Sequence, residues 1–489
     1  MKRREFLQNG VLAAAGLSAA SFGALSAPRR RQGTGAARVV VIGAGLAGLS
    51  AGYQLTRAGL EVTVLEARMR PGGRVHTLRE PFADGLHAEA GAMFIPDAHD
   101  LTMHYARLLR LPLVPIPLSR RSPVYYLLGK RIDPGRGRNI DWPVTLSPEE
   151  KRLGLAGMTE KYLIPVLNEM GNPRAINWPP ESLKKYDRMT YAEFLRDRGA
   201  SREALRLLRL NDADLTGDGV DSVSALMVLR EAALNQNVET LYTIRGGTDL
   251  LPTALAARMS GRVRYGAPVT KIEQSSRGVG VSISTPQGKE TLEAEYLICT
   301  IPFSVLKGIE ISPLFSAAKR RAISELPYTS AARVYLQSRS EFWTSEGLGI
   351  SAYTDLPIMA IVNSTLNQPG TRGILESYAA GENARRITAR TESDRISFTL
   401  GQMSKVYPAI SKNVEGGASV CWDEDRWARG AYAWFKPGQM SEFLPQVARV
   451  EGRIHFAGEH TSAWPGWMQG AFQSGHRAAQ EVLNASRGR

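Results

Sequence analysis

The chain has 489 residues and a formal net charge of +14, and 43% of its residues are hydrophobic and 8% aromatic. This length accommodates two or three domains with a sizeable core, and the composition is typical of a globular protein. The basic residues are scattered, with no block longer than Arg29-Arg30-Arg31, which argues against nucleic acid as a partner and indicates a solvated surface. Only Cys299 and Cys421 are present, without metal-ligand spacing, so we expect no metal site and two free thiols.

Residues 1–27 have the pattern of a twin-arginine signal peptide. Arg3-Arg4 is followed by an apolar, alanine-rich stretch from Val11 to Leu25, and small residues suited to cleavage lie at its end. The stretch is too short, and its side chains too small, for a membrane span. We therefore expect the twin-arginine translocation machinery to export the folded protein, which would then be periplasmic or secreted. An uncleaved anchor or a cytoplasmic tail is the alternative.

A dinucleotide-binding unit is predicted after this segment. The apolar run Val39–Ile42 indicates a buried parallel strand, and a helix is predicted from Leu46 to Ala58. A second strand follows from Glu61 to Leu65, and Glu66 at its end can accept a hydrogen bond from a ribose hydroxyl. Between the first strand and the helix, a G-x-G-x-x-G turn presents the helix N-terminus to a pyrophosphate. The glycines of this turn are Gly43, Gly45 and Gly48.

The residues that follow distinguish between dinucleotides. The run 66–74, Glu-Ala-Arg-Met-Arg-Pro-Gly-Gly-Arg, resembles the second signature of the flavin amine oxidase family, which includes monoamine, polyamine and L-amino-acid oxidases. The resemblance covers residues 36–485 and implies an α/β fold, with a Rossmann-like FAD-binding domain, a mixed-sheet substrate domain and a helical insert. It also implies that FAD is the cofactor. Within this run it assigns cofactor contacts to Glu66, Ala67, Arg68, Gly73 and Arg74.

The same resemblance divides the mature chain into segments. The substrate-domain sheet is expected at residues 312–420, and the helical insert with part of the substrate domain at residues 97–236. FAD-binding segments are expected at residues 36–96, 237–311 and 421–489.

The insert carries helix signals but no catalytic constellation. Ser147 and Thr190 each begin a capping box, which predicts that a helix starts at the next residue. His99 and His104 are isolated in the sequence, and we expect them to be loop or surface histidines.

Further cofactor contacts are implied by the resemblance. Residues 88–96 match a stretch whose backbone passes the flavin, where small residues allow close approach to a flat ring. Val269 matches a strand that meets the adenine, and Glu459 matches a carboxylate on the ribityl chain. Residues 466–470 match the start of a helix under the flavin pyrimidine ring, where a helix N-terminus stabilises negative charge. The contacts implied in these segments are Gly91, Ala92, Met93, Val269, Trp422, Glu459, Gly466, Trp467 and Met468.

The amine site is assigned in the same way. Oxidation of an amine needs a hydride acceptor that no side chain supplies, so the cofactor must accept the electrons. In the family two aromatic rings flank the substrate nitrogen, and Tyr432 and Trp467 match these positions. The alternative is that both are ordinary core aromatic residues. Phe94 and Gly466 are expected to complete the substrate site.

Three positions depart from the family pattern. Ala431 stands where some members carry the cysteine that binds FAD covalently, so we expect non-covalent FAD. Arg333 stands where a lysine usually reaches flavin N5 through a water, and it is a candidate catalytic residue. Phe94 stands where L-amino-acid oxidases carry the arginine that holds the substrate carboxylate.

Together these residues predict an FAD-dependent oxidase of a primary or secondary amine. Hydride transfer to flavin N5 would give an imine and then an aldehyde or ketone, with electrons passed to O2 or another acceptor. An L-amino-acid oxidase, which yields a 2-oxo acid, ammonia and hydrogen peroxide, is the first alternative. A carotenoid-type desaturase or isomerase and a non-catalytic flavoprotein are further alternatives. A homodimer is compatible with the sequence, which does not determine the assembly.

Overall fold

The computed structural model describes residues 36–117, 123–134, 140–175, 177–210, 215–346 and 351–488. The predicted signal peptide at residues 1–27 lies outside these ranges. From Ala37 onward the described residues belong to one structural unit. None of the described helices is both long enough and apolar enough to cross a membrane.

A five-stranded parallel sheet carries the dinucleotide turn. Strand β1 lies at its centre and pairs in parallel with β2 on one side and β14 on the other. Because both faces of such a sheet are covered, a central strand is typically a continuous apolar run, which is the pattern that predicted β1. In spatial order the strands are β10 (Val263–Arg264), β2 (Glu61–Leu65), β1 (Arg38–Ile42), β14 (Tyr296–Cys299) and β21 (Ile454–Phe456).

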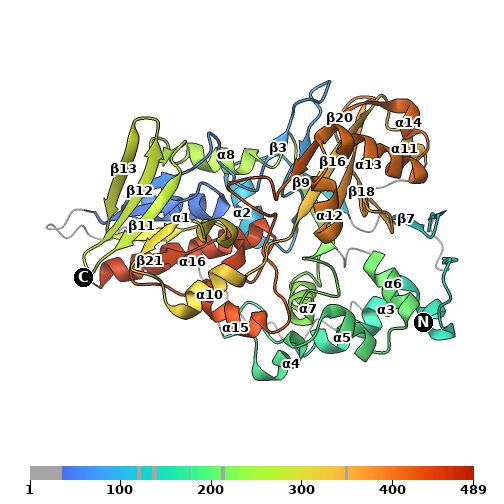
Figure 1. Ribbon diagram of the computed structural model, residues 1–489, viewed down its shortest axis with the longest axis horizontal. Coiled ribbons are helices and arrows are strands. Elements are labelled where there is room, and N and C mark those ends of the chain that lie inside the picture. Colours follow the sequence, from blue (N-terminus) through green and yellow to red (C-terminus); the bar gives the residue numbers. More distant parts are fainter. Residues whose placement is uncertain are drawn as a thin grey trace. The chain divides into compact units, whose positions relative to one another are not determined.

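Two helices from opposite ends of the described chain pack on each other beside this sheet. Helix α1 (Leu46–Arg57) begins at the residue predicted, and Ala58 is its C-cap. Helix α16 (Met468–Arg487) approaches it so closely that a Cβ atom on Gly475 would lie 2.4 Å from the carbonyl oxygen of Ala47. The glycine therefore permits close helix packing, and the cofactor turn and the C-terminal signature become neighbours (Figure 1).

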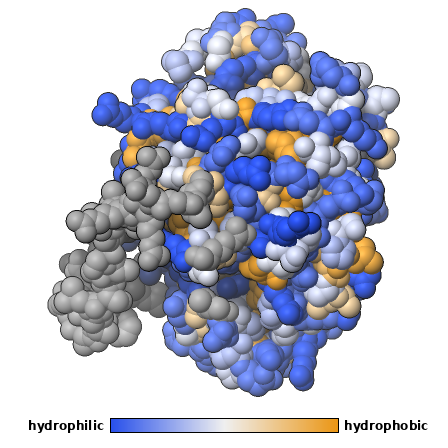
Figure 2. All heavy atoms as spheres, turned by 90° about the vertical axis from the view of Figure 1, so that its left-hand side faces the viewer, coloured by the Kyte–Doolittle hydropathy of each residue, from blue (hydrophilic) through white to orange (hydrophobic). Residues whose placement is uncertain are grey.

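A four-stranded sheet lies beyond the first one. Strand β12 pairs antiparallel with β11 and β13, and β11 pairs in parallel with β15. Figure 2 shows the side of the molecule that lies at the left in Figure 1, where this sheet is found. Hydrophilic residues predominate on this face, and hydrophobic residues are scattered among them. In spatial order the strands are β13 (Gly288–Ala294), β12 (Val279–Thr285), β11 (Val269–Gln274) and β15 (Glu310–Ser312).

A seven-stranded mixed sheet combines strands from residues 331–421 with two strands from residues 124–132. Its strands pair antiparallel except for β17 and β7, which are parallel. Helices α12 (Gly381–Thr388) and α13 (Glu392–Val406) pack against β16. In spatial order the strands are β20 (Val414–Cys421), β16 (Ala331–Ser338), β19 (Gly373–Ala380), β18 (Ala360–Asn363), β17 (Ser351–Thr354), β7 (Val124–Leu127) and β8 (Lys130–Ile132).

The helical insert is a separate group of helices in Figure 1. Both predicted capping boxes are confirmed, because the side chains of Ser147 and Thr190 accept hydrogen bonds from the backbone N–H groups of Glu150 and Glu193. The insert helices are α3 (Pro148–Leu167), α4 (Lys184–Asp187), α5 (Tyr191–Asp197), α6 (Arg202–Leu210) and α7 (Ala225–Leu234).

Smaller elements connect these parts. Strands β3 and β4 form a two-stranded sheet, and β5, β9 and β6 form a three-stranded one. These strands are β3 (Thr77–Leu78), β4 (Ala88–Glu89), β5 (Ile95–Pro96), β6 (Leu113–Pro117) and β9 (Thr240–Ile244). The remaining α-helices are α2 (Asp100–Leu108), α8 (Leu250–Ala257), α9 (Phe303–Leu306), α10 (Ala317–Glu325), α11 (Phe342–Ser345), α14 (Ile410–Asn413) and α15 (Gln439–Val447).

Candidate active site

A cavity of about 1260 Å³ extends from the β1–α1 turn to the seven-stranded sheet and the start of α16. Of the site residues predicted from the sequence, all but Gly48 line it. Gly48 instead faces the turn, because a Cβ atom there would lie 1.9 Å from the carbonyl oxygen of Gly43. The predicted residues are therefore brought together around one space.

The turn between β1 and α1 leaves room for a diphosphate. Gly43 has a φ of 102°, a conformation that favours glycine. A Cβ atom on Gly45 would meet no protein atom within 4 Å, and this residue lines the cavity at the N-terminus of α1. The open space, the helix terminus and the size of the cavity fit the predicted dinucleotide cofactor.

Glu66 is buried and is held by backbone groups. Its Oε2 accepts a hydrogen bond of 2.8 Å from the N–H of Ala44, and its Oε1 accepts one of 2.9 Å from the N–H of Arg68. A carboxylate oxygen can accept more than one hydrogen bond, so Glu66 can order the turn and still accept one from a ribose hydroxyl.

Two arginines of the second signature make ion pairs with the C-terminal part of the chain. Arg68 pairs with Asp425 at 2.5 Å, and Arg74 pairs with Glu459 at 2.7 Å. The other oxygen of Glu459 accepts a hydrogen bond of 2.8 Å from the N–H of Gly466. Glu459 therefore joins the second signature to the segment that starts α16, in addition to lining the cavity.

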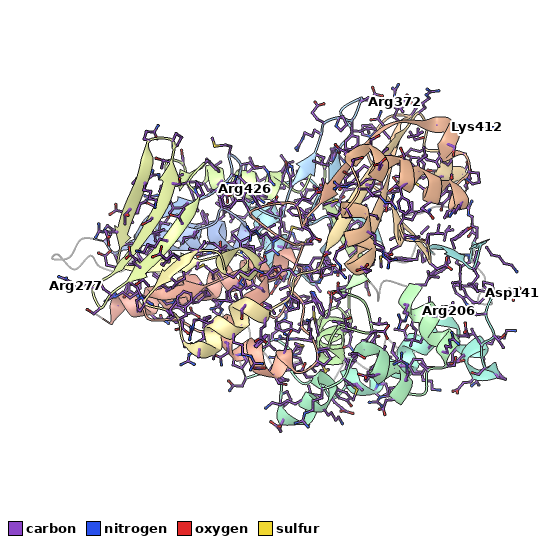
Figure 3. The ribbon with its side chains drawn as sticks, viewed as in Figure 1. Asp141, Arg206, Arg277, Arg372, Lys412 and Arg426 are labelled. Carbon is purple, nitrogen blue, oxygen red and sulfur yellow. The ribbon has the colours of Figure 1, made fainter. Side chains whose placement is uncertain are left out.

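The loop after Asp425 adds groups that sequence reasoning missed. Arg426 stacks on the ring of Trp427 at 4.1 Å, and both residues line the cavity. Figure 3 shows Arg426 on the side of the nucleotide-binding sheets, away from Arg372 and Lys412 beside the seven-stranded sheet. Their spacing in the sequence matches no motif that would have identified them.

Gly91 lines the cavity and is also required by packing within the protein. A Cβ atom on Gly91 would lie 1.8 Å from the carbonyl oxygen of Arg74 and 3.3 Å from the ring of Trp422. The space beside its Cα is therefore filled by protein, so internal packing also requires a glycine here, and the predicted contact with the flavin stays a prediction. Trp422 also donates a hydrogen bond of 2.8 Å from Nε1 to the carbonyl oxygen of Ala90.

Tyr432 and Trp467 lie at the other end of the cavity. Trp467 donates a hydrogen bond of 2.8 Å from Nε1 to Oε1 of Glu231 on α7. The hydroxyl of Tyr432 donates one of 2.6 Å to the carbonyl oxygen of Leu215 and lies 3.0 Å from the hydroxyl of Tyr378. Burial raises the pKa of Tyr432 well above its usual value, so its hydroxyl stays neutral. Glu231 and Tyr378 were missed because neither belongs to a recognisable motif.

His99 lies in a loop, as one part of the prediction had it, but it is not at the surface. His99 is buried and packs edge-on against Trp464 at 4.6 Å and Trp467 at 4.9 Å. Burial lowers the pKa of His99 to about 3, so the ring is neutral at physiological pH. A surface position is excluded because His99 immediately precedes α2, which packs against α16. The exposed His104 agrees with its prediction.

Arg333 is part of a buried ion pair on the cavity wall. Its Nη1 lies 3.0 Å from Oε1 of Glu376 and donates a hydrogen bond of 2.9 Å to the carbonyl oxygen of Glu89. The guanidinium also lies 4.7 Å from the centre of the Tyr378 ring. Burial alone would lower the pKa of Arg333, but the charge of Glu376 outweighs it, and the net pKa is raised. Sequence reasoning missed Glu376, whose strand gives no functional signal.

Other chemistry is not apparent at this site. In the described part of the chain, no three His, Cys, Asp or Glu side chains are grouped so that they could hold a metal ion. Cys299 and Cys421 are both free and buried, which confirms the expectation of two thiols.

Comparison with known proteins identifies the family. The family model described as flavin containing amine oxidoreductase matches residues 46–483. A Bacillus subtilis (strain 168) protein, YobN, which is provisionally named an L-amino-acid oxidase, is 34% identical over 91% of this chain and 94% of its own length. The L-amino-acid oxidase BmooLAAO-I of Bothrops moojeni is 30% identical over 92% of this chain and 90% of its own length.

Solved structures support the same fold at lower identity. Cyclohexylamine oxidase from Brevibacterium oxydans IH-35A aligns with a TM-score of 0.79 and 22% identity, covering 92% of this chain and 100% of that one. Putrescine oxidase bound to putrescine aligns with a TM-score of 0.77 and 21% identity, covering 92% and 99%. The predicted fold class and the FAD cofactor are thereby confirmed. The chain belongs to the flavin containing amine oxidoreductase family and is an FAD-dependent amine oxidoreductase.

Proposed function

We propose that this enzyme oxidises a primary or secondary amine that lacks an α-carboxylate. The charge at the amine end of the cavity carries the proposal. Arg333 on this wall is already paired with Glu376, while Glu231 places a further carboxylate beside Trp467. A substrate carboxylate at this end would need a cation that is not already paired. Burying a carboxylate without such a partner costs roughly several kcal/mol. An arriving ammonium group instead finds a carboxylate.

The residues at this end would bind and orient the amine. The rings of Tyr432 and Trp467 would flank the nitrogen, since electron-rich faces attract an amine or its ammonium form. Glu231 would accept hydrogen bonds from the ammonium, and Phe94 would provide apolar surface for the substituent. These groups would also exclude water from the reacting C–H bond. The imine product would leave and hydrolyse to an aldehyde or ketone.

The cofactor is held at the opposite end. Backbone at Gly45 and the N-terminus of α1 would bind the diphosphate, Glu66 a ribose hydroxyl, and Val269 the adenine. When bound, FAD supplies the hydride acceptor that no side chain provides, and it returns the electrons to O2, giving hydrogen peroxide, or to another acceptor. Ala431 offers no thiol for a covalent bond, so acid precipitation should release yellow flavin into the supernatant. Flavin that remained in the pellet would contradict non-covalent binding.

Matched substrate pairs test the proposed substrate class. The ratio kcat/KM should be higher for phenylethylamine than for phenylalanine, and higher for tryptamine than for tryptophan, with peroxide formation as the readout. Each pair differs only in the carboxylate, so the comparison isolates that group. Consistently higher efficiency with the amino acids would overturn the proposal.

L-amino-acid oxidation is the second candidate. It is favoured by the names of relatives that are 30–34% identical over about nine-tenths of the chain. In that case the substrate carboxylate would have to displace Glu376 from Arg333 or find another cation. The products would be a 2-oxo acid and ammonia, and detection of a 2-oxo acid from phenylalanine identifies this activity directly.

We also propose that the enzyme acts outside the cytoplasm. The support is the sequence of residues 1–27 alone, with Arg3-Arg4 ahead of an apolar stretch. Replacement of both arginines by lysine should keep active holoprotein in the cytoplasmic fraction. Unchanged export of that variant would argue against the twin-arginine route. Light scattering of the mature holoprotein would decide whether it forms a homodimer.

A further inference from the structure

A buried carboxylate lies directly behind the cofactor-lining segment 91–93. Glu89 ends strand β4 and is 8% exposed, and among the described residues its carboxylate makes no ion pair. Its neighbours are hydroxyl and backbone groups instead of cations. An isolated ionised carboxylate is costly to bury, so burial favours the protonated form of Glu89.

The hydrogen-bond distances around Glu89 define a short chain of groups. Oε1 accepts a hydrogen bond of 2.8 Å from the N–H of Thr248. Oε2 lies 2.8 Å from the hydroxyl of Thr77 and 2.5 Å from the hydroxyl of Thr248. The hydroxyl of Thr248 also lies 2.8 Å from the carbonyl oxygen of Ala92, and Ala92 lines the cofactor cavity.

The Thr248 hydroxyl has one proton but two acceptor neighbours. If Glu89 is ionised, this proton is drawn to the carboxylate, and the carbonyl of Ala92 loses its donor. If Glu89 is protonated, its O–H donates to Thr248, and Thr248 is free to donate to Ala92. Thr77 can donate to Glu89 in both cases, because its own oxygen accepts the N–H of Asp249 at 3.3 Å. Only the protonated form satisfies every group.

We propose that Glu89 is a positioning residue that holds a proton and, through Thr248, fixes the carbonyl of Ala92 against the bound cofactor. Ionisation of Glu89 releases this carbonyl and loosens one contact on the flavin side of the cavity. The proposal concerns the cofactor and is independent of which amine the enzyme oxidises.

The surrounding charges favour the protonated form. Burial raises the pKa of Glu89 to about 7, although hydrogen bonds from Thr248 and Thr77 oppose this and Asp249 adds to it. Asp249 is neutralised by Arg79, which lies 2.8 Å away. The groups on β16 and β19 are Arg333 and Tyr335, which donate to the main-chain oxygen of Glu89, and Glu376, which pairs with Arg333. No net cation remains near the carboxylate among these groups.

Replacement of Glu89 by glutamine tests the proposal, because Gln has nearly the same shape and its amide can donate to Thr248 at every pH. The dissociation constant of FAD should be measured between pH 5.5 and 8.5 by reconstitution of the apoprotein, with the visible flavin spectrum of the holoprotein recorded in parallel. In the unaltered protein the constant should rise about fivefold across a single step near neutrality, the effect of one lost hydrogen bond. In Glu89→Gln the step should be absent, with the tight, low-pH value retained throughout.

Threonine variants distinguish the hydrogen-bond chain from a general structural role. Thr248→Val should bind FAD weakly and without a pH step, and Thr248→Ser should restore both the affinity and the step. Thr77→Val is the matched control, since it removes a hydroxyl from Glu89 that does not reach Ala92, and it should keep the step at a shifted pH. A step that persists in Glu89→Gln or in Thr248→Val, or a flat profile in the unaltered protein, would overturn the proposal.

Discussion

The phosphate end of the cavity is built from neighbours in the sequence, whereas the amine end is assembled from segments far apart in the chain. At the first end, β1, the glycine turn, α1 and Glu66 follow one another directly. At the second, Glu231 comes from α7, Arg333 from β16, Glu376 from β19 and Trp467 from the residue before α16. The phosphate end therefore depends mainly on local backbone geometry, whereas the amine end depends on side chains that tertiary packing brings together.

Two glycine substitutions give the largest expected effect and separate fold from binding at the phosphate end. Gly48→Ala places a Cβ atom against the carbonyl oxygen of Gly43 and should destabilise the apoprotein by about 3 kcal/mol in urea denaturation. Gly45→Ala meets only open cavity, so apoprotein stability should be unchanged while FAD affinity falls by at least about tenfold. Equal stability losses in both variants would show that the turn, and not the ligand, occupies the space at Gly45.

Trp467 tests whether the amine end depends on its aromatic wall. Trp467→Ala should retain FAD but lose about ten- to a thousandfold in kcat/KM, the range expected for lost positioning. Trp467→Phe keeps a ring and removes the hydrogen bond to Glu231, and it should lose less. Steady-state kinetics on the purified holoproteins provide the measurement. Wild-type kinetics in a folded Trp467→Ala variant would remove this residue from the site.

Glu376 sharpens the link between charge and substrate class. Glu376→Gln leaves Arg333 without its partner, so the guanidinium becomes available to a substrate carboxylate. The ratio of kcat/KM for phenylalanine to that for phenylethylamine should rise at least about tenfold. This is the size of effect expected when a charge-assisted hydrogen-bonded pair forms between arginine and a carboxylate. Glu415→Gln, on β20 of the same sheet, alters contacts with Arg372, Arg339 and Gln337 and should leave the ratio unchanged. If Glu376→Gln leaves the ratio unchanged, the ion pair between Arg333 and Glu376 does not control substrate selectivity.

Arg333→Lys should have the smallest effect and tests what the cation contributes. Lysine keeps the charge but loses the planar fork that lies against Tyr378 and contacts Glu376. We expect the rate of flavin reoxidation to change roughly several-fold. This change should exceed the change in the rate of flavin reduction by the amine, because the position of the positive charge at this wall affects how well it stabilises the negative charge that develops on oxygen. Stopped-flow absorbance measures the two half-reactions separately. A larger change in the reductive half-reaction would contradict this assignment.

The sequence identified those parts of the site that short-range patterns encode. The end of β1, the bounds of β2 and the start of α1 follow from an apolar run, a glycine turn and a helix stop, all local signals, whereas β1 begins one residue earlier than predicted. The positions of Tyr432, Trp467 and Glu459 on the cavity came from the family resemblance. The predicted domain boundaries stay predictions, since strands of one sheet come from several segments.

The positions of the glutamates around the cavity could not be predicted from local sequence patterns. Glu89, Glu231 and Glu376 lie in strands and a helix where a glutamate is usually a solvated residue. Tertiary packing places them beside a hydroxyl, an indole and a cation, respectively. His99 is another residue whose surroundings depend on tertiary packing. It is isolated in the sequence but packs against two tryptophans in the structure.

The contact between α1 and α16 has a consequence for biosynthesis. The cavity needs Gly43 and Met468 together, and α16 begins only when almost the entire chain has been made. A nascent chain on the ribosome therefore has the glycine turn early but lacks the wall that completes the cofactor pocket. The complete cofactor pocket can therefore form only after almost all of the chain has been synthesised.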